Sequence, residues 1–425
     1  MRRSLATATA IGVALAGVTS LQGSALAKPK PRDVAVGTRL AAKTNPAVQS
    51  IQDSFTATVV VREPVPTKAF RALFAKAERQ AKAGRIPADH QSQVNWVLRT
   101  ATKNVKKYLA PGKAVKKSST VAGGLCTGWW ITPDGYMVTA SHCVGVDNAT
   151  LRQLFVGQAL SKTVKRDVRD FTNLVSTFAQ PDEEMTGLAE RMFAAYHLRA
   201  MRLLGLQEQL SVVLHDGTGK ITVGGLKLVA KGSNFPGEDF ALLKMAGARG
   251  LPTVSLGHDD DVRVGDYLYI SGFPDITLLN PYLDARSKLY PSVTEGAYNV
   301  KRTTVKGVPY LQAQAPAYHG SSGGPVFGQD GRVIGMLIAG NLKSDGGFTE
   351  NASFVLPVSI IKRRLGAAAV EPVVSRTSRV YSSGLDDYFA GRYEAALDKF
   401  RRARELYPAH PYVGAFIADA KKALR

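Results

Sequence analysis

Short apolar runs separated by turn residues constrain the fold of this chain more than any other feature of its sequence. The runs are rich in β-branched and aromatic residues, and the 40 Gly and 21 Pro of the chain supply turns between them. Many short strands with turn signals indicate an antiparallel barrel or sandwich, so a mainly β fold is expected. The predicted strands are 125–132, 136–139, 210–215, 221–229, 240–245, 267–271, 310–314, 325–327 and 333–338.

Residues 150–206 interrupt this β pattern and are predicted to be helical. Their apolar side chains recur at spacings of three and four, which is the period of a helix face. Pro181 and the acids 182–184 start a second helix, because carboxylates suit the positive end of a helix dipole. The segment is therefore expected to be a helical hairpin inserted between strands.

The C-terminal segment, residues 378–425, is also predicted to be helical. Small and aromatic residues fall at the offsets of a tetratricopeptide repeat: Gly384, Gly391, Tyr393, Ala396, Phe400, Ala403 and Pro408. An ordinary helical hairpin is the alternative. A single repeat cannot bury a core alone, so the segment is expected to pack on the rest of the chain, on another subunit or on a partner protein.

The first 27 residues have the features of a signal peptide. Arg2 and Arg3 precede an apolar run at 11–18, and Ala25-Leu26-Ala27 is a small-residue cleavage site before Lys28. The run is too short to span a bilayer, which disfavours an uncleaved anchor, and no later stretch approaches about 18 apolar residues. We expect a secreted or cell-envelope protein without an integral membrane span after cleavage.

Residues 28–118 form a basic leader. The chain has a formal net charge of +21, and the stretch from Lys28 to Lys117 holds 19 basic and 5 acidic residues. This charge is compatible with binding to an anionic polymer and equally with a basic surface that is only solvated. The leader is expected to hold a strand at 55–61, helices near 67–83 and 88–109, and a linker at 111–119. A pro-region, a docking arm and an accessory domain remain possible roles.

Three separated motifs carry residues suited to acyl transfer. His142, in Thr139-Ala140-Ser141-His142-Cys143, has a side chain whose ordinary pKa of about 6.5 lets it accept a proton at neutral pH. Asp239 opens a strand of small and apolar residues, where its carboxylate could orient that imidazole. Alternatively, Asp239 is a solvent-facing acid that caps the strand.

The third motif is the loop Gly320-Ser321-Ser322-Gly323-Gly324-Pro325. Its glycines allow sharp turns that bring backbone N–H groups toward a substrate carbonyl. Ser322 is the candidate nucleophile, with Ser321 as its rival, and the amides of Gly320 and Ser322 are the candidate oxyanion hole. Taken alone, the loop is also compatible with a flexible Gly/Ser turn.

Together these motifs resemble those of the trypsin-like (chymotrypsin-fold) serine proteases. That family carries Thr-Ala-x-His-Cys, an Asp heading an Ala-Leu-Leu-Lys-like strand, and Gly-x-Ser-Gly-Gly-Pro in this order. The resemblance covers roughly residues 120–365 and implies two six-stranded antiparallel β-barrels in a domain at 119–368, with His142, Asp239 and Ser322 as the triad. Residues 333–335 and 354–358 are similar to the bacterial HtrA-like branch, whose PDZ-like domain is replaced here by the helical segment.

Cys126 and Cys143 are the only cysteines. Export to an oxidising compartment makes a disulfide the natural interpretation, and the resembling family has a cysteine pair flanking its histidine strand. Closing a loop of this size contributes about 3 kcal/mol. Two Cys and 7 His offer too few ligands for a zinc site, so no metal is expected.

The sequence therefore predicts an exported serine endopeptidase that acts on protein or peptide substrates through an acyl-enzyme, without a cofactor. Two alternatives are a catalytically silent binding protein, acting through the repeat or the leader, and a latent enzyme whose cleft the leader or insert blocks. Pro316 stands six residues before Ser322, where an acid would select Lys or Arg. Walls at 317–319 and 336–338 are expected to accept a small or medium apolar P1 side chain.

Overall fold

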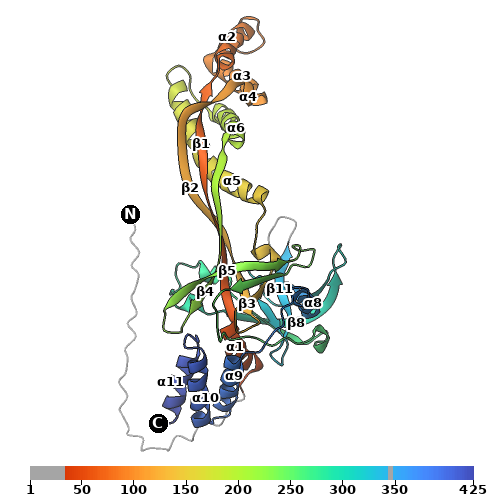
Figure 1. Cartoon of the computed structure of the whole chain (residues 1–425). Coiled ribbons are helices and arrows are strands. Elements are labelled where there is room, and N and C mark those ends of the chain that lie inside the picture. The colour runs from red at the N-terminus through yellow and green to blue at the C-terminus, as the bar shows by residue number, and fades with distance from the viewer. Residues whose placement is uncertain (1–33, 343–347) are drawn as a thin grey trace, which may run out of the picture.

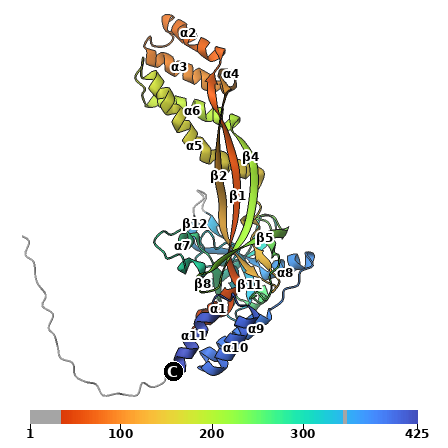
Figure 2. The same cartoon turned by 60° about the vertical axis from the view of Figure 1, so that its left-hand side comes forward.

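The structure is a computed structural model that describes residues 34–342 and 348–425 (Figure 1). It contains two six-stranded antiparallel sheets, a long arm built on the first sheet, and a C-terminal helical unit. The arm tip and the C-terminal helices lie at opposite ends of the molecule in both views (Figures 1 and 2). The predicted signal peptide, residues 1–27, lies outside the described residues. Within the described ranges, no helix combines the length and apolarity that crossing a membrane requires.

The first sheet has the strand order β1-β2-β3-β6-β5-β4, and β1 also pairs with β4, which closes the ring. Side chains alternate along β1, where Ile51, Phe55 and Val59 are buried, as expected for a strand with one face on a core. The strands are β1 (Val48–Pro66), β2 (Leu109–Trp130), β3 (Tyr136–Thr139), β4 (Arg202–His215), β5 (Ile221–Lys231) and β6 (Ala241–Met245).

The second sheet has the order β10-β11-β12-β9-β8-β7 and is closed by pairing of β10 with β7. One continuous apolar core joins the two sheets, with Trp129 and Phe240 from the first and Tyr310 and Phe327 from the second. The strands are β7 (Tyr267–Gly272), β8 (Ser292–Thr303), β9 (Pro309–Ala313), β10 (Pro325–Phe327), β11 (Val333–Leu342) and β12 (Phe348–Pro357). Two short helices, α7 (Asp275–Leu278) and α8 (Val358–Ala367), flank this sheet.

The arm, defined here as residues 54–120 and 148–206, extends β1, β2 and β4 beyond the first barrel (Figure 2). Leu73, Leu98 and Met192 belong to its separate apolar core. Its helices are α2 (Lys68–Lys82), α3 (His90–Lys103), α4 (Val105–Tyr108), α5 (Asn148–Val175) and α6 (Glu183–Ala200). The predicted helices of the leader and the predicted helical hairpin are therefore confirmed, except that residues 202–206 belong to β4, and the two sets of helices pack on one another.

The C-terminal unit consists of α9 (Arg376–Phe389), α10 (Tyr393–Leu406) and α11 (Val413–Ala423), with α1 (Val36–Thr44) against α9. A Cβ on Gly384 would meet the Phe400 ring at 2.8 Å, so glycine permits the close crossing of α9 and α10. Thr253 donates its backbone N–H to Ser378 Oγ at 2.7 Å, which ties the unit to the barrels. The segment is thus helical and packs on the rest of the chain.

Three fold predictions need correction. The expectation of a mainly β chain is wrong, because the arm and the C-terminal unit give the helices more residues than the strands hold. The expected linker at 111–119 is wrong, because these residues lie inside β2 and pair with β1. The first barrel also draws on the leader, since β1 begins at Val48, far before the expected start of the β region near residue 120.

Candidate active site

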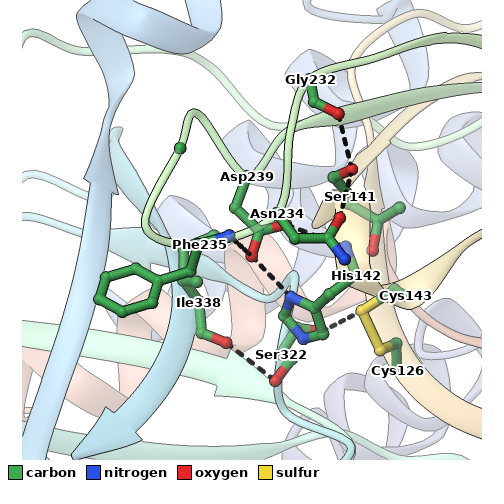
Figure 3. Close-up of polar contacts among 12 residues, drawn as sticks. Cys126, Ser141, His142, Cys143, Gly232, Asn234, Phe235, Asp239, Ser322 and Ile338 are labelled. Atoms are coloured by element: carbon green, nitrogen blue, oxygen red, sulfur yellow. Dashed lines mark hydrogen bonds and ion pairs between the residues drawn. A yellow bond between two sulfur atoms is a disulfide. The ribbon is translucent and has the colours of Figure 1, made fainter. Parts of the chain in front are cut away.

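His142 and Asp239 meet at the junction of the two sheets (Figure 3). His142 lies in a 3-10 turn directly after β3, and Asp239 precedes β6, the strand that pairs with β3. The Nδ1 of His142 is 2.8 Å from Asp239 Oδ2, and the His142 backbone N–H donates to Asp239 Oδ1 at 2.9 Å. The carboxylate therefore holds both the ring and the backbone of the histidine.

The loop that carries Asp239 is fixed by groups that sequence reasoning missed. The Phe235 backbone N–H donates to Asp239 Oδ2 at 3.1 Å, and the Tyr310 hydroxyl donates to the Gly237 carbonyl at 2.6 Å. The buried Ser141 hydroxyl lies 2.9 Å from both the Gly232 carbonyl and Asn234 Oδ1. Asp239 is fully buried, yet three N–H groups serve its two oxygens, as a buried carboxylate requires.

The Ser322 loop depends on close backbone approaches. Gly323 has φ +83°, and a Cβ there would lie 2.3 Å from the Thr127 carbonyl oxygen and from Thr139 Oγ1. The Trp129 indole N–H donates to the Gly323 carbonyl at 3.1 Å, and the Thr127 N–H donates to the Ser322 carbonyl at 2.9 Å. Strand β2 therefore clamps this loop against the first barrel.

Ser322 and His142 line one cleft, but no hydrogen bond joins their side chains in the part of the chain that the structure describes. The Ser322 hydroxyl donates to the Ile338 carbonyl at 3.1 Å (Figure 3). The predicted pair His142 and Asp239 is thus brought into contact, whereas the serine hydroxyl is directed to β11.

The loop also leaves two backbone donors available. Neither the Gly320 nor the Ser322 amide N–H donates a hydrogen bond to another described residue. Gly320 has φ +84°, and its carbonyl accepts from Thr127 Oγ1 at 2.8 Å, which fixes the orientation of the turn. Two amides held without an acceptor beside a hydroxyl are the arrangement that an oxyanion site requires.

Cys126 and Cys143 form the predicted disulfide, with a Cα–Cα distance of 5.9 Å. Cys126 belongs to β2 and Cys143 follows His142, so the bond ties the histidine turn to the first barrel. His142 lies close to both sulfur atoms. Because the sulfur atoms are bonded to each other, they are not thiolate ligands, and this group does not suit a metal ion.

The cleft, of about 760 Å³, continues from His142 and Ser322 to the base of the arm, where β1, β2 and α5 line it. Asp53 of β1 is buried in this wall and accepts from the Gly145 N–H at 3.1 Å. Burial, aided by the charge of Glu208, raises the pKa of Asp53 to about 6. Sequence reasoning missed Asp53, because nothing in the pattern of β1 distinguishes it from a surface acid.

Comparison with known proteins shows what the region around these residues is similar to. Residues 126–336 match the family model described as "Trypsin-like peptidase domain". This part of the chain is therefore similar to a trypsin-like peptidase domain. The match begins at Cys126 and includes His142, Asp239 and Ser322.

Curated relatives of the peptidase domain are named as probable periplasmic serine endoproteases, DegP-like. The one from Rhizobium meliloti is 31% identical over 39% of this chain and 29% of its own length. The one from Pseudomonas fulva is 34% identical over 29% of this chain and 24% of its own length. The match thus spans less than a third of these relatives. A solved structure titled "HtrA-type protease AlgW with decapeptide" covers 79% of this chain and 68% of its own, at 16% identity and a TM-score of 0.40.

Proposed function

We propose that this protein is an exported serine endopeptidase that hydrolyses peptide bonds through an acyl-enzyme intermediate. The observation that carries the proposal is the contact of His142 with the buried Asp239 at the edge of a cleft that Ser322 also lines. An oriented imidazole beside a serine hydroxyl is the arrangement that activates such a nucleophile. The match to the trypsin-like peptidase domain supports the same chemistry.

In the proposed reaction, Ser322 Oγ attacks the substrate carbonyl carbon while His142 takes the hydroxyl proton. Asp239 keeps the proton of His142 on Nδ1 and stabilises the imidazolium that forms. The amides of Gly320 and Ser322 stabilise the oxyanion. The imidazolium then protonates the leaving amine as the C–N bond breaks, and water attacks the acyl-enzyme by the same route to release the acid and restore Ser322.

The hydrogen bond from Ser322 to Ile338 defines the resting state in this proposal. The hydroxyl must leave the Ile338 carbonyl before it can donate to His142. Catalytic hydrogen bonds are often long or poorly aligned until substrate binds. The same contact is the one observation that favours the alternative, a silent protease fold that acts as a binding protein.

The remaining parts of the proposal concern location and specificity. Export rests on the signal-peptide pattern at 1–27 and on relatives named as periplasmic. The pocket beside Pro316 is proposed to take a small or medium apolar P1 side chain. The helices at 378–425 are proposed to be a tetratricopeptide-like unit that binds a protein partner, and the basic leader is proposed to bind an anionic polymer.

Labelling with a fluorophosphonate separates the two functions. An active enzyme is modified at Ser322, and Ser322→Ala should lower kcat by about 10⁶ without unfolding the chain. Ser321→Ala is the matched control and should keep both labelling and turnover. Well-folded protein that hydrolyses no peptide in a mixed library and is not labelled at Ser322 would establish the binding-protein alternative.

A further inference from the structure

The tip of the arm carries an apolar groove that the proposed chemistry does not use. The groove has a volume of about 490 Å³, within the range of ligand sites, and lies between the end of β1, α2, α5 and α6. Three of its lining side chains are substantially exposed, Phe74 at 40%, Leu174 at 66% and Phe178 at 47%. Its apolar lining is Phe70, Phe74, Phe171, Leu174, Phe178 and Phe193. Exposed aromatic and leucine side chains gathered in a concavity mark an interaction site.

The charges around this groove favour an acidic occupant. The arm holds 22 basic and 9 acidic residues, a net charge of +13. Arg71 lines the groove and has no carboxylate partner in the part of the chain that the structure describes.

The acids that line the groove are each paired with a cation of the arm. Glu63 contacts Lys116 at 2.9 Å, and Asp170 lies 3.6 Å from Arg169. Asp167 is bound by Arg166 at 2.6 Å and is also 2.6 Å from His197 Nε2. Because these negative charges are compensated, the unpaired guanidinium of Arg71 and the net positive charge of the arm give the groove a preference for acidic ligands.

The groove and the active-site cleft share a strand. β1 lines the cleft at 52–55 and the groove at 63–66. Eleven residues separate Asp53 from Pro64, which at about 3.3 Å per residue places the two sites roughly 36 Å apart. An extended polypeptide needs about 11 residues to cover that distance.

We propose that the tip groove binds a segment of a substrate protein in which large apolar side chains alternate with acidic ones, and that it holds this segment while a peptide bond about 11 or more residues away enters the cleft. The binding step stands on the groove alone, whereas the delivery step rests on the proposed peptidase activity. A second copy of the arm would bring a like charge of +13, and residues 1–33 of this chain are themselves basic, so neither is a suitable occupant. The concave shape suits peptide side chains better than a bilayer surface.

Binding is measured by fluorescence anisotropy on full-length Ser322→Ala protein, which cannot cleave the probe. The probe is a labelled synthetic peptide of about 16 residues that alternates Leu or Phe with Glu. We expect affinity at least about tenfold higher than for a peptide with Lys in place of Glu, or with Ser in place of the apolar residues. Leu174→Glu and Phe178→Glu should each weaken binding by at least about tenfold, the effect of losing one central anchor.

Val305→Glu is the matched control, since Val305 is 96% exposed in the turn between β8 and β9, outside the arm, and it should leave binding unchanged. Equal affinity for the three peptides, or an equal effect of the three substitutions, would overturn the proposal. So would sedimentation with phosphatidylglycerol vesicles that is lost in Leu174→Glu and is not displaced by the acidic probe, because the groove would then serve a membrane.

Delivery is measured with active enzyme and a cleavable peptide joined to the probe by a Gly/Ser spacer. A spacer of about 14 residues should raise kcat/KM by about tenfold or more, whereas one of about 5 should not, because a tether too short to span the sites gives no effective concentration. Leu174→Glu should remove this gain and leave the rate on the untethered peptide unchanged. An equal gain with both spacers contradicts the 36 Å separation. If no peptide is cleaved at all, the peptidase proposal fails while the anisotropy result still decides the groove.

Discussion

At the scale of single residues, the conformation of the Ser322 loop depends on how little space surrounds its backbone. Gly323 has positive φ and lies against two oxygen atoms of the first barrel, whereas Gly331 has φ +78° with nothing within 4 Å of a Cβ. The two positions share the left-handed conformation and differ only in their surroundings. They therefore separate the cost of conformation from the cost of collision.

Gly323→Ala should destabilise the fold by roughly 2–6 kcal/mol, combining backbone strain with a collision that moves the loop. Gly331→Ala should cost only about 1 kcal/mol, the strain alone. Urea denaturation of the two variants measures both values. Similar unfolding midpoints for the two would show that the clamp of the loop by Thr127 and Thr139 is not a tight contact.

Asp239→Asn should lower kcat by about 10⁴ with little change in KM, because the amide cannot hold the proton of His142 on Nδ1. Steady-state kinetics measure the split, and the rate of fluorophosphonate labelling should fall in parallel. The buried amide also loses an acceptor for the His142 and Phe235 backbone N–H groups, so circular dichroism must show the fold intact. An unchanged kcat in a folded variant would remove Asp239 from the mechanism.

At the scale of elements, the histidine turn is held by a covalent bond as well as by strand pairing. Replacing both cysteines, by Cys126→Ser and Cys143→Ser, should lower the free energy of unfolding by about 3 kcal/mol, the value for a loop of this length. Urea denaturation measures it. Reductant should produce the same loss of stability in the native chain and none in the double variant. A loss caused by reductant in both proteins would show that it does not come from the disulfide.

The start of α11 provides a pH-dependent contribution to stability. His410 Nδ1 accepts the backbone N–H groups of Tyr412 and Val413 at 3.3 Å and 3.2 Å, and burial lowers the pKa of His410 to about 3. An unfolded chain binds a proton on this imidazole below pH about 6.5, whereas the folded chain does not until pH about 3. Folding therefore loses stability as the pH falls from about 6.5 toward about 3.

His410→Asn keeps an acceptor for the start of α11 and removes the titration. Between pH 6.5 and pH 4.5 the variant should lose less stability than the native chain, by about 2 kcal/mol, as measured by urea denaturation at each pH. His258→Asn is the control, since His258 is exposed. Parallel losses in all three proteins would show that carboxylates alone set the pH dependence.

At the scale of the whole molecule, local patterns predicted where helices and strands lie far better than they predicted which strands pair in one sheet. Tyr136–Thr139 and the helices around Lys68–Lys82 and Glu183–Ala200 follow from apolar period and turn residues, and the three motifs named His142, Asp239 and Ser322. The pairing of Val48–Pro66 with β2 could not be predicted, because that pairing joins residues about 60 positions apart across three helices. The Pro-Gly and Lys-Lys signals inside β2 also favour a linker when taken locally.

The candidate site likewise combines features that local sequence predicts with features that arise only in the fold. The glycines were predictable because they lie in one motif, and the disulfide because Cys126 and Cys143 are the only two cysteines. The partners of the Asp239 loop were not, since Asn234, Tyr310 and Phe235 carry no local signal and come together only in the fold. Likewise, the tip groove depends on α2 and α5 meeting around the end of β1.

The strand β1 has one more consequence. It closes the first ring of strands, because it is hydrogen-bonded to β2 on one side and to β4 on the other. Truncation from the N-terminus to residue 118 would remove it, and two unpaired strand edges would face solvent, a state prone to aggregation. Trimming of the leader to residue 118 is therefore incompatible with a folded first sheet, and a shortened chain that keeps this sheet must be made by internal excision. Arg62 and Val115 face each other in register, so a tight turn joining them would retain the ring.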